Sequence, residues 1–412
     1  MALNLVVSML TARYLGPSNY GLINYAASIV AFLIPVMQLG LRSTLVQEFV
    51  DAPDREGKIL GTAIALNIAG ALACIAAVFS FTSVVNASEP ETILICVLYS
   101  VSLLFQAVEI IQYWFQAKLM AKYPSVAMLF SYVAVSAYKI FLLITGKSVY
   151  WFAVSHAIDF AIISAVLVVV YLVKGEQKLG FSFRLAGKML SRSKYYIVSG
   201  LMVNVFQLTD RVMLKHMAGD EMTGLYSAAV ACSGITIFVF NAIIDSYRPS
   251  ILQKFKSGES EAEDETATLY SVVIYLSLLQ CVAIDVLAKP LVLLLYGQDY
   301  VGSVGALRIV TWFTLFSVIG TVRNIWILAH GRQRVLLVVN LCGAVMNIGL
   351  NLVLIPVIGM IGASVASVVC QCFANVVVTE FIPGIRRNNR ILLMGLDPRR
   401  LVRFAGGILR KK

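Results

Sequence analysis

Charged residues are scarce in this sequence. They make up 13% of the 412 residues, whereas hydrophobic residues make up 59% and the mean hydropathy is +0.84. A soluble domain carries about 25% charged residues, so a chain with so few could not cover its own surface in water. The composition therefore excludes a soluble globular protein and predicts an all-α membrane protein, because lipid is the solvent that accepts such an apolar excess.

The sequence also lacks the residue patterns of catalytic and metal sites. Its three histidines lie far apart, and its seven cysteines lie inside apolar runs without a disulfide spacing. Cys370 and Cys372 have no second ligand pair nearby, so we interpret them as packing residues and not as metal ligands. There is no nucleophile–base arrangement and no Gly-rich phosphate loop. We therefore predict that the protein is not an enzyme and has no metal and no cofactor.

The apolar stretches predict about twelve transmembrane helices, since each span needs about 20 residues. The first predicted helix is short, because twelve residues rise only about 18 Å across a hydrocarbon core of about 30 Å. Either the start is truncated, which we favour, or a shortened first helix lies inside the bundle. The predicted helices are residues 1–12, 19–46, 58–82, 91–117, 123–145, 150–173, 190–217, 222–248, 266–289, 301–329, 334–356 and 360–383.

Lysine and arginine are divided unevenly between the two sides of the predicted membrane. Of the 33 basic residues, 25 lie in the loops after even-numbered helices or in the C-terminal tail, and four lie in the opposite loops. The positive-inside rule then predicts a multi-pass protein of the cell inner (cytoplasmic) membrane with a cytoplasmic C-terminus. The same asymmetry accounts for the net charge of +11, so no nucleic acid partner is predicted.

The two halves of the chain resemble each other. Gly21 and Gly224 begin similar segments 203 positions apart, and Trp114 and Trp326 lie in similar segments 212 positions apart. The repeats predict two pseudo-symmetric six-helix lobes that face each other across a central cavity. The predicted parts are an N-terminal lobe at 1–175, a cytoplasmic basic linker at 176–194, a C-terminal lobe at 195–385 and a basic cytoplasmic tail at 386–412. From Arg399 onward, the tail fits either a segment on anionic headgroups or a disordered end.

Several ionisable residues lie well inside predicted spans. Each costs about 3 kcal/mol at a lipid-facing helix centre, so nine would cost about 27 kcal/mol, more than a typical folding free energy of about 5–15 kcal/mol. They must mostly face one another or water, and this predicts a hydrophilic cavity. For each single polar residue the alternative is a helix–helix hydrogen bond or a static ion pair. The nine are Glu109, Lys139, Asp159, Asp210, Arg211, Asp245, Asp285, Arg308 and Arg323.

Short motifs along the chain resemble those of Wzx-type polysaccharide-biosynthesis flippases, which flip lipid-linked oligosaccharides. This family belongs to the multidrug/oligosaccharidyl-lipid/polysaccharide exporter superfamily, and the resemblance implies a MATE-like fold. The motifs keep the order of the family, and the short first helix is the one departure. They are Arg13-Tyr14-Leu15-Gly16-Pro17-Ser18-Asn19-Tyr20-Gly21, Leu39-Gly40-Leu41, Asp210 with Gly224-Leu225-Tyr226-Ser227-Ala228-Ala229, Leu295-Tyr296-Gly297-Gln298-Asp299-Tyr300 and Ala329-His330-Gly331-Arg332.

The resemblance implies that the protein flips polyprenyl-pyrophosphate-linked oligosaccharide repeat units by alternating access. The product would serve synthesis of a surface polysaccharide such as O-antigen, capsule or exopolysaccharide. Implied partners are this lipid-linked substrate, membrane lipids, H⁺ or Na⁺ as a coupling ion, and a polysaccharide polymerase with its chain-length regulator.

The polar residues inside the predicted spans are candidates for binding such a substrate. Basic side chains in a cavity of low dielectric would hold the pyrophosphate, and amides suit sugars. We predict substrate binding by Lys139, Arg211, Arg323, Gln106, Gln112, Asn204 and Asn347. We predict ion coupling or ion pairing for Glu109, Asp159, Asp210 and Asp245, of which only Asp210 falls in a matching motif.

Two other functions compete with this one. A cation-coupled multidrug exporter of the same superfamily shares the twelve-helix plan, although its drugs would favour an acidic cavity. A membrane polymerase or ligase has similar hydropathy, but it needs a substantial outer loop, and the predicted outer loops are short.

Overall fold

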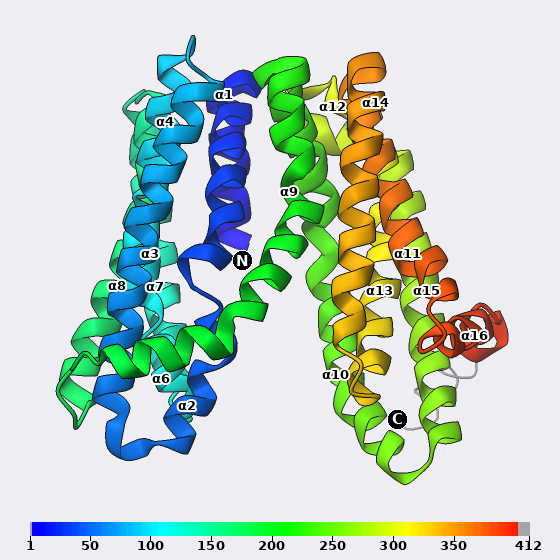
Figure 1. The fold of residues 1–412 in the computed structure, drawn as a ribbon. Coiled ribbons are helices and arrows are strands. Elements are labelled where there is room, and N and C mark those ends of the chain that lie inside the picture. The colour runs from blue at the N-terminus through cyan, green and yellow to red at the C-terminus, as the bar shows by residue number, and fades with distance from the viewer. Residues whose placement is uncertain (1, 403–412) are drawn as a thin grey trace. The chain divides into compact units, whose positions relative to one another are not determined.

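The computed structural model describes residues 2–402, which form helices joined by short turns (Figure 1). No β-strand occurs in this range, and the all-α prediction is confirmed. The chain divides into two compact units, Met1–Val212 and Met213–Lys412, which we call unit 1 and unit 2. Residues 403–412 of the predicted tail lie outside the described residues.

Nine continuous helical stretches of the described chain are long and apolar enough to cross a membrane. Three of them contain an internal break, at Gly16, at Gly219 and at Ile358–Gly359. Dividing these three stretches at their breaks gives twelve helical segments. The number of predicted helices is therefore confirmed.

The breaks at Gly16 and Gly219 show the internal repeat in the backbone. Their φ angles are +71° and +87°, a left-handed conformation that only glycine adopts without strain. The two glycines are 203 positions apart, the same spacing as Gly21 and Gly224. Each half of the chain thus has a glycine of positive φ where one span ends and the next begins.

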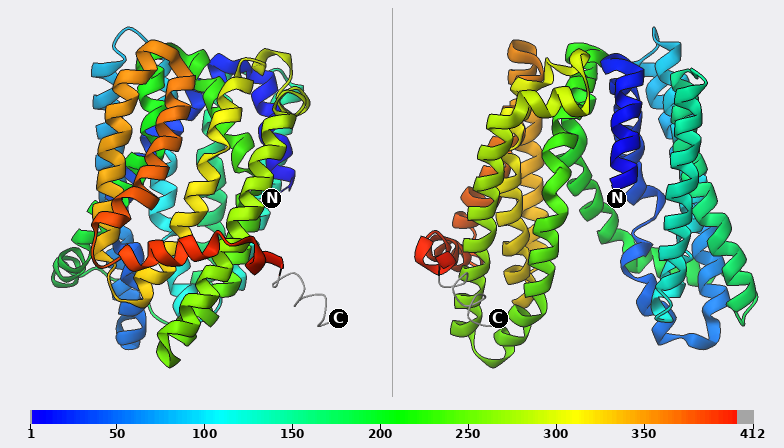
Figure 2. Two further views of the ribbon diagram at one scale, coloured as in Figure 1. Left: turned by 90° about the vertical axis from the view of Figure 1, so that its right-hand side faces the viewer. Right: turned by 180° about the vertical axis from the view of Figure 1, so that it is seen from behind.

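Unit 1 is built from helices that pack side by side along most of their length (Figures 1 and 2). Its elements are α1 (Ala2–Met37), η1 (Leu41–Ser43), α2 (Leu45–Asp51), η2 (Pro53–Arg55), α3 (Glu56–Val85), α4 (Pro90–Ser100), α5 (Ser102–Glu109), α6 (Gln112–Ala117), α7 (Lys122–Ile144), α8 (Val149–Lys174) and the first part of α9 (Phe183–Ser233).

Unit 2 begins within α9 and repeats this plan. Its further elements are η3 (Gly234–Thr236), α10 (Ile237–Ser257), α11 (Glu259–Leu295), η4 (Gln298–Tyr300), α12 (Ser303–Val310), α13 (Phe313–Ala329), α14 (Arg334–Cys372), the π-helical turn η5 (Phe373–Val377), α15 (Val378–Phe381) and α16 (Arg386–Gly395).

The predicted helix 19–46 is wrong at its C-terminal end, because α1 stops at Met37. Leu39 and Gly40 both have positive φ, +51° and +67°, so the chain turns before the short elements η1 and α2 begin. The apolar run continues through the turn, and for this reason hydropathy does not reveal it. Pro35 lies in the last turn of α1, where its missing N–H weakens the helix.

The predicted tail contains a helix that packs on unit 2. The Tyr270 hydroxyl donates to Asn388 Oδ1 at 3.1 Å, and Arg387 pairs with Glu263 at 2.5 Å and with Glu259 at 3.0 Å. The hydrogen bond to Glu263 raises the pKa of Arg387. The acidic start of α11 therefore holds α16 in place.

The linker between α8 and α9 packs closely against the start of α3 and is hydrogen-bonded to it. The Gly180 amide donates to the Gly57 carbonyl at 3.1 Å, and the Gly57 amide donates to Gln177 Oε1 at 3.0 Å. A Cβ at Gly61 would lie 2.4 Å from the Gly180 carbonyl oxygen. Only glycine leaves room for the linker at this position.

Replacing Gly61 with alanine should therefore displace the linker. Overpacking of this kind costs about 1–3 kcal/mol, and we expect the Tm of the purified protein to fall by about 5 °C. Limited proteolysis should also cut residues 175–182 faster. Gly187→Ala is the matched control, because a Cβ there meets nothing within 4 Å. Equal Tm values and equal cleavage for the two variants would refute the close packing.

Candidate functional site

Five helices of unit 1 bring ionisable and aromatic side chains together inside the predicted membrane spans. The residues come from α4, α5, α7, α8 and α9, and each lies in a stretch apolar enough to cross a membrane. We call them the unit 1 polar cluster. Its members are Tyr99, Glu109, Ser131, Lys139, His156, Asp159 and Arg211.

Asp159 of α8 is the acidic centre of the polar cluster. The hydroxyl of Ser131, on α7, donates to Asp159 Oδ1 at 2.5 Å, and Ser131 is fully buried. Asp159 also interacts electrostatically with Lys139, Glu109 and Tyr99. One carboxylate thus links four neighbouring helices through its charge.

Lys139 and Arg211 are cations without a close acidic partner. Among the described residues, no hydrogen-bond acceptor is within bonding distance of either side chain, and no carboxylate lies within 4.0 Å. The Nε of Arg211 is buried with no hydrogen-bond partner. Unpaired positive charge inside a span is expensive, so its presence points to a ligand that supplies negative charge.

Two rings of the polar cluster are stacked. The rings of Tyr99 and His156 are 4.2 Å apart and nearly parallel, and Phe160 meets His156 edge-on at 5.0 Å. Tyr99 interacts electrostatically with Arg211, and His156 does so with Lys139. The stacked rings therefore belong to the same cluster as the two cations.

Four more predicted residues of unit 1 lie near this cluster or on its helices. Gln112 donates to Glu109 Oε1 at 3.2 Å, and Gln106 donates to the Ser102 hydroxyl one turn away at 3.3 Å. Asn204 donates to the Ala31 carbonyl at 2.5 Å and so ties α9 to α1. Asp210 is buried beside Arg211 in the sequence.

Arg323, in unit 2, has a very different environment. Its side chain is 2% exposed, and its guanidinium donates to Asn375 Oδ1 at 2.9 Å, to the Ala374 carbonyl at 3.2 Å and to Asn324 Oδ1 at 2.9 Å. These bonds join α13 to the π-helical turn η5. Its predicted role in anion binding stays a prediction, while its contacts are those of a residue that holds two elements together.

The other predicted site residues of unit 2 are Asn347 and Asp245. Asn347 is buried and accepts a hydrogen bond from Asn351 at 3.1 Å, one turn along α14. Asp245 pairs with Arg248 at 3.0 Å on an exposed face of α10. Both contacts are local to one helix.

Sequence reasoning missed Tyr99 and Ser131. Ser131 precedes Lys139 by two helical turns, so it lies on the same face of α7, and this spacing was the available signal. Tyr99 has no comparable signal, because its role depends on its stacking against a helix distant in sequence.

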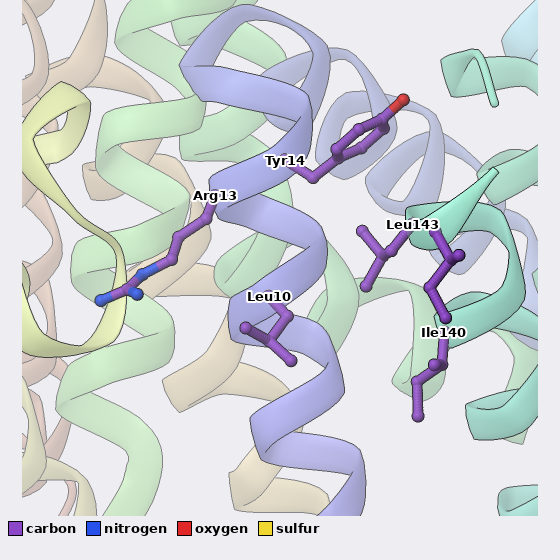
Figure 3. Close-up of a pocket in the computed structure, with 6 residues that line it drawn as sticks. Leu10, Arg13, Tyr14, Ile140 and Leu143 are labelled. Carbon is purple, nitrogen blue, oxygen red and sulfur yellow. The ribbon is translucent and has the colours of Figure 1, made fainter. Parts of the chain in front are cut away.

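An apolar cavity of about 500 Å³ opens between α1 and α7 (Figure 3). Ile140 and Leu143 extend from α7 toward α1, and Tyr14 lies on the side of α1 nearer α7, whereas the Arg13 guanidinium extends away from it. The Tyr14 hydroxyl donates to the Lys147 carbonyl at 3.2 Å. Ile140 follows Lys139 directly in the sequence.

Comparison with known protein families shows which family the chain belongs to. The family model described as polysaccharide biosynthesis protein matches residues 1–253. This chain belongs to the polysaccharide biosynthesis protein family. The matched residues include the whole of unit 1 and therefore the polar cluster. No curated protein sequence matches the chain.

Solved structures share the fold of this family member at low identity. An inward-facing multidrug resistance MATE family transporter of the MOP superfamily has a TM-score of 0.73 and 14% identity over 94% of this chain and 95% of that one. The lipid II flippase MurJ, in an inward closed conformation, has a TM-score of 0.74 and 15% identity over 96% and 88%.

A MOP superfamily transporter from Pyrococcus furiosus has a TM-score of 0.63 and 14% identity over 95% of this chain and 92% of that one. The predicted MATE-like fold is confirmed by these likenesses. Family and fold together identify a multi-pass membrane protein of the polysaccharide biosynthesis protein family, with the fold seen in the MATE transporter and in MurJ.

Proposed function

We propose that this protein flips polyprenyl-pyrophosphate-linked oligosaccharide repeat units across the cytoplasmic membrane by alternating access. The single observation that carries the proposal is the pair of unpaired cations, Lys139 and Arg211, inside the spans of unit 1. Membership of the polysaccharide biosynthesis protein family supports it. On this proposal the protein is a transporter and not an enzyme, and its product feeds synthesis of a surface polysaccharide.

A pyrophosphate fits the chemistry of the polar cluster. It carries negative charge on several oxygens, and a guanidinium and an ammonium bind phosphate oxygens in different ways, as a flat fork and as a point charge. In a site of low dielectric each such contact is stronger than in water. Arg211 and Lys139 would hold the pyrophosphate, while Gln106, Gln112 and Asn204 would contact sugar hydroxyls.

The carboxylates of the cluster suit a coupling role. Glu109 has Gln112 as its hydrogen-bond partner, and Asp159 has Ser131, so neither is held in a close ion pair with Lys139. We propose that one of these two acids binds H⁺ or Na⁺ during the cycle, and that substrate and ion compete for Lys139. The buried Asp210 is the third candidate for this role in unit 1, and the exposed Asp245 of unit 2 is the least suited.

The apolar cavity between α1 and α7 offers a place for the lipid tail. Leu10, Ile140, Leu143 and Ile144 line it, and these apolar side chains can pack against an isoprenoid chain as they would against lipid. Ile140 and Lys139 lie on the same helix, α7, and we propose that a tail in this cavity belongs to a substrate whose pyrophosphate binds at Lys139.

The proposal is tested with purified protein in liposomes that contain a fluorescent prenyl-diphosphate-linked oligosaccharide. Protection of the fluorophore from a membrane-impermeant quencher reports translocation. We expect faster translocation with the protein than in protein-free liposomes, and no acceleration for a lipid of the same length that carries neither phosphate nor sugar. Equal rates with and without protein would refute the proposal.

A cation-coupled multidrug exporter is the second candidate, because the fold matches a multidrug resistance MATE family transporter. Cationic drugs would be repelled by Lys139 and Arg211, and this favours the flippase. Drug susceptibility of cells that express the protein separates the two functions. Raised resistance to cationic drugs, combined with no lipid translocation, would select the exporter. On the flippase proposal, the C-terminus is cytoplasmic and a polymerase with its chain-length regulator are candidate partners.

A further inference from the structure

A second cavity, of about 610 Å³, lies at the end of unit 1 where α2 is labelled in Figure 1. Its walls are the segment from α2 to the start of α3 on one side and the linker and first turns of α9 on the other. We call it the linker pocket. The polar side chains that line it are Glu48, Arg55, Lys58, Ser182, Arg184 and Lys188. By the positive-inside rule this end of unit 1 is the predicted cytoplasmic end.

The linker pocket holds more positive charge than its own acid can neutralise. Glu48 is already bound by Lys188 at 3.3 Å and by Arg192. Arg55, Lys58 and Arg184 have no carboxylate within 4.0 Å anywhere in the described chain. Three cations around one cavity are therefore available to an anion from outside the protein.

Hydrogen bonds also hold one wall of the linker pocket in place. The Ser182 amide donates to Thr62 Oγ1 at 3.1 Å, and Gln177 Nε2 donates to the Pro53 carbonyl at 2.8 Å. Together with the contact between Gly57 and Gly180, these bonds fix the linker wall against α3. A preformed arrangement of charges binds a ligand with less loss of conformational entropy than a flexible basic loop.

Apolar side chains beside the pocket indicate that its ligand belongs to a lipid. Leu179 is 48% exposed, Phe181 48% and Phe183 85%, and these residues alternate with the pocket residues Ser182 and Arg184. The Phe181 and Phe183 rings meet edge-on at 4.7 Å. Figure 1 shows the first turns of α9 running across the end of unit 1. Exposed aromatic residues beside basic ones are typical of segments that lie in the membrane interface.

We propose that the linker pocket binds the phosphate headgroup of a lipid in the adjacent leaflet. Arg55, Lys58 and Arg184 contact the phosphate oxygens, and Phe181 and Phe183 lie among the acyl or prenyl chains. The site is distinct from the polar cluster inside the spans, and it does not depend on the flippase function. Its lipid comes from one of two sources, the prenyl diphosphate substrate or a bulk anionic phospholipid, which share the same phosphate chemistry.

The test is a binding measurement on the full-length protein in phosphatidylcholine nanodiscs, with no transport step. Farnesyl diphosphate and phosphatidylglycerol are the two probes, and farnesol and inorganic pyrophosphate are the reference ligands. The variant Arg55→Gln/Lys58→Gln/Arg184→Gln removes the three available cations. The control Lys122→Gln/Lys174→Gln/Lys194→Gln removes three exposed lysines of the same end of unit 1.

We expect the pocket variant to bind at least one phosphate lipid about tenfold or more weakly than wild type, and the control to stay within about threefold. A loss confined to farnesyl diphosphate identifies the substrate as the source, and a loss confined to phosphatidylglycerol identifies bulk lipid. The single variant Arg184→Glu, at an exposed position, should also weaken binding of the phosphate lipid. It keeps the proposal testable if the triple variant does not fold.

Two results overturn the proposal. One is equal affinity of wild type, pocket variant and control for both phosphate lipids. The other is binding of inorganic pyrophosphate as tight as that of farnesyl diphosphate, since the apolar neighbours would then contribute nothing. The flippase function can fail in liposomes while this binding persists, and the reverse is also possible, so the two tests are independent.

Discussion

Replacing Lys139 or Arg211 with glutamine should slow translocation of a prenyl-diphosphate-linked oligosaccharide by about 10- to 150-fold. A hydrogen bond to a charged group contributes about 1.5–3 kcal/mol, and each 1.4 kcal/mol is a factor of ten. Both side chains lie inside spans and have no acidic partner within 4.0 Å among the described residues. Their charge is thus available to the substrate. The measurement is the initial rate of fluorophore protection in liposomes.

The controls for this prediction come from the same unit. Lys147→Gln removes an exposed charge just beyond the end of α7 and should leave the rate within about twofold of wild type. Because glutamine is unbranched at Cβ and keeps a polar end group, both site variants should fold. Wild-type rates in both Lys139→Gln and Arg211→Gln would exclude the polar cluster as the pyrophosphate site.

Replacing Arg323 with methionine should lower the Tm by about 10 °C and leave substrate affinity nearly unchanged. The substitution removes three hydrogen bonds from a side chain that is 2% exposed, and it leaves the Ala374 carbonyl and Asn375 Oδ1 without this donor. Unsatisfied buried groups of this kind cost about 1–3 kcal/mol each, and 1 kcal/mol shifts Tm by about 2–4 °C in a unit of this size.

Arg308→Met is the matched control for Arg323. Arg308 is about half exposed, its ion pair with Asp285 is long, at 3.9 Å, and its hydrogen bond to the Asp285 carbonyl, at 3.3 Å, is also exposed. Its loss should therefore change the Tm by no more than about 2 °C. If Arg323→Met kept its Tm but bound substrate about tenfold more weakly, Arg323 would be an anion-binding residue, as its place in a span first suggested.

The positions of the helices could be predicted from the sequence because lipid imposes a simple rule on composition. A span must be long and apolar, and hydropathy detects this without any knowledge of packing. Helix ends were harder, as the turn at Leu39 and Gly40 shows, because the apolar run passes through it. The helix α16 was also missed, since it is fixed by Tyr270 and Glu263 on a distant segment and not by its own hydropathy.

The candidate site was only partly predictable for a similar reason. Counting charges inside spans identified Lys139, Asp159 and Arg211, because any such charge is costly and needs an explanation. For the same reason, Arg323 was predicted to bind the anion as well. Only the coordinates separate them, since the partners of Arg323 are the amide of Asn375 and a main-chain carbonyl exposed by the π-helical turn. Neither partner has a recognisable spacing from Arg323 in the sequence.

Photo-cross-linking tests the central claim most directly. A prenyl-diphosphate-linked sugar with a photoreactive group beside the diphosphate would be bound to the wild-type protein, irradiated and mapped by mass spectrometry. We expect labelled peptides from α7 around Lys139 and from α9 around Arg211, and loss of labelling when unmodified substrate competes. Competed labelling confined to α13 around Arg323, with none on α7 or α9, would contradict the claim.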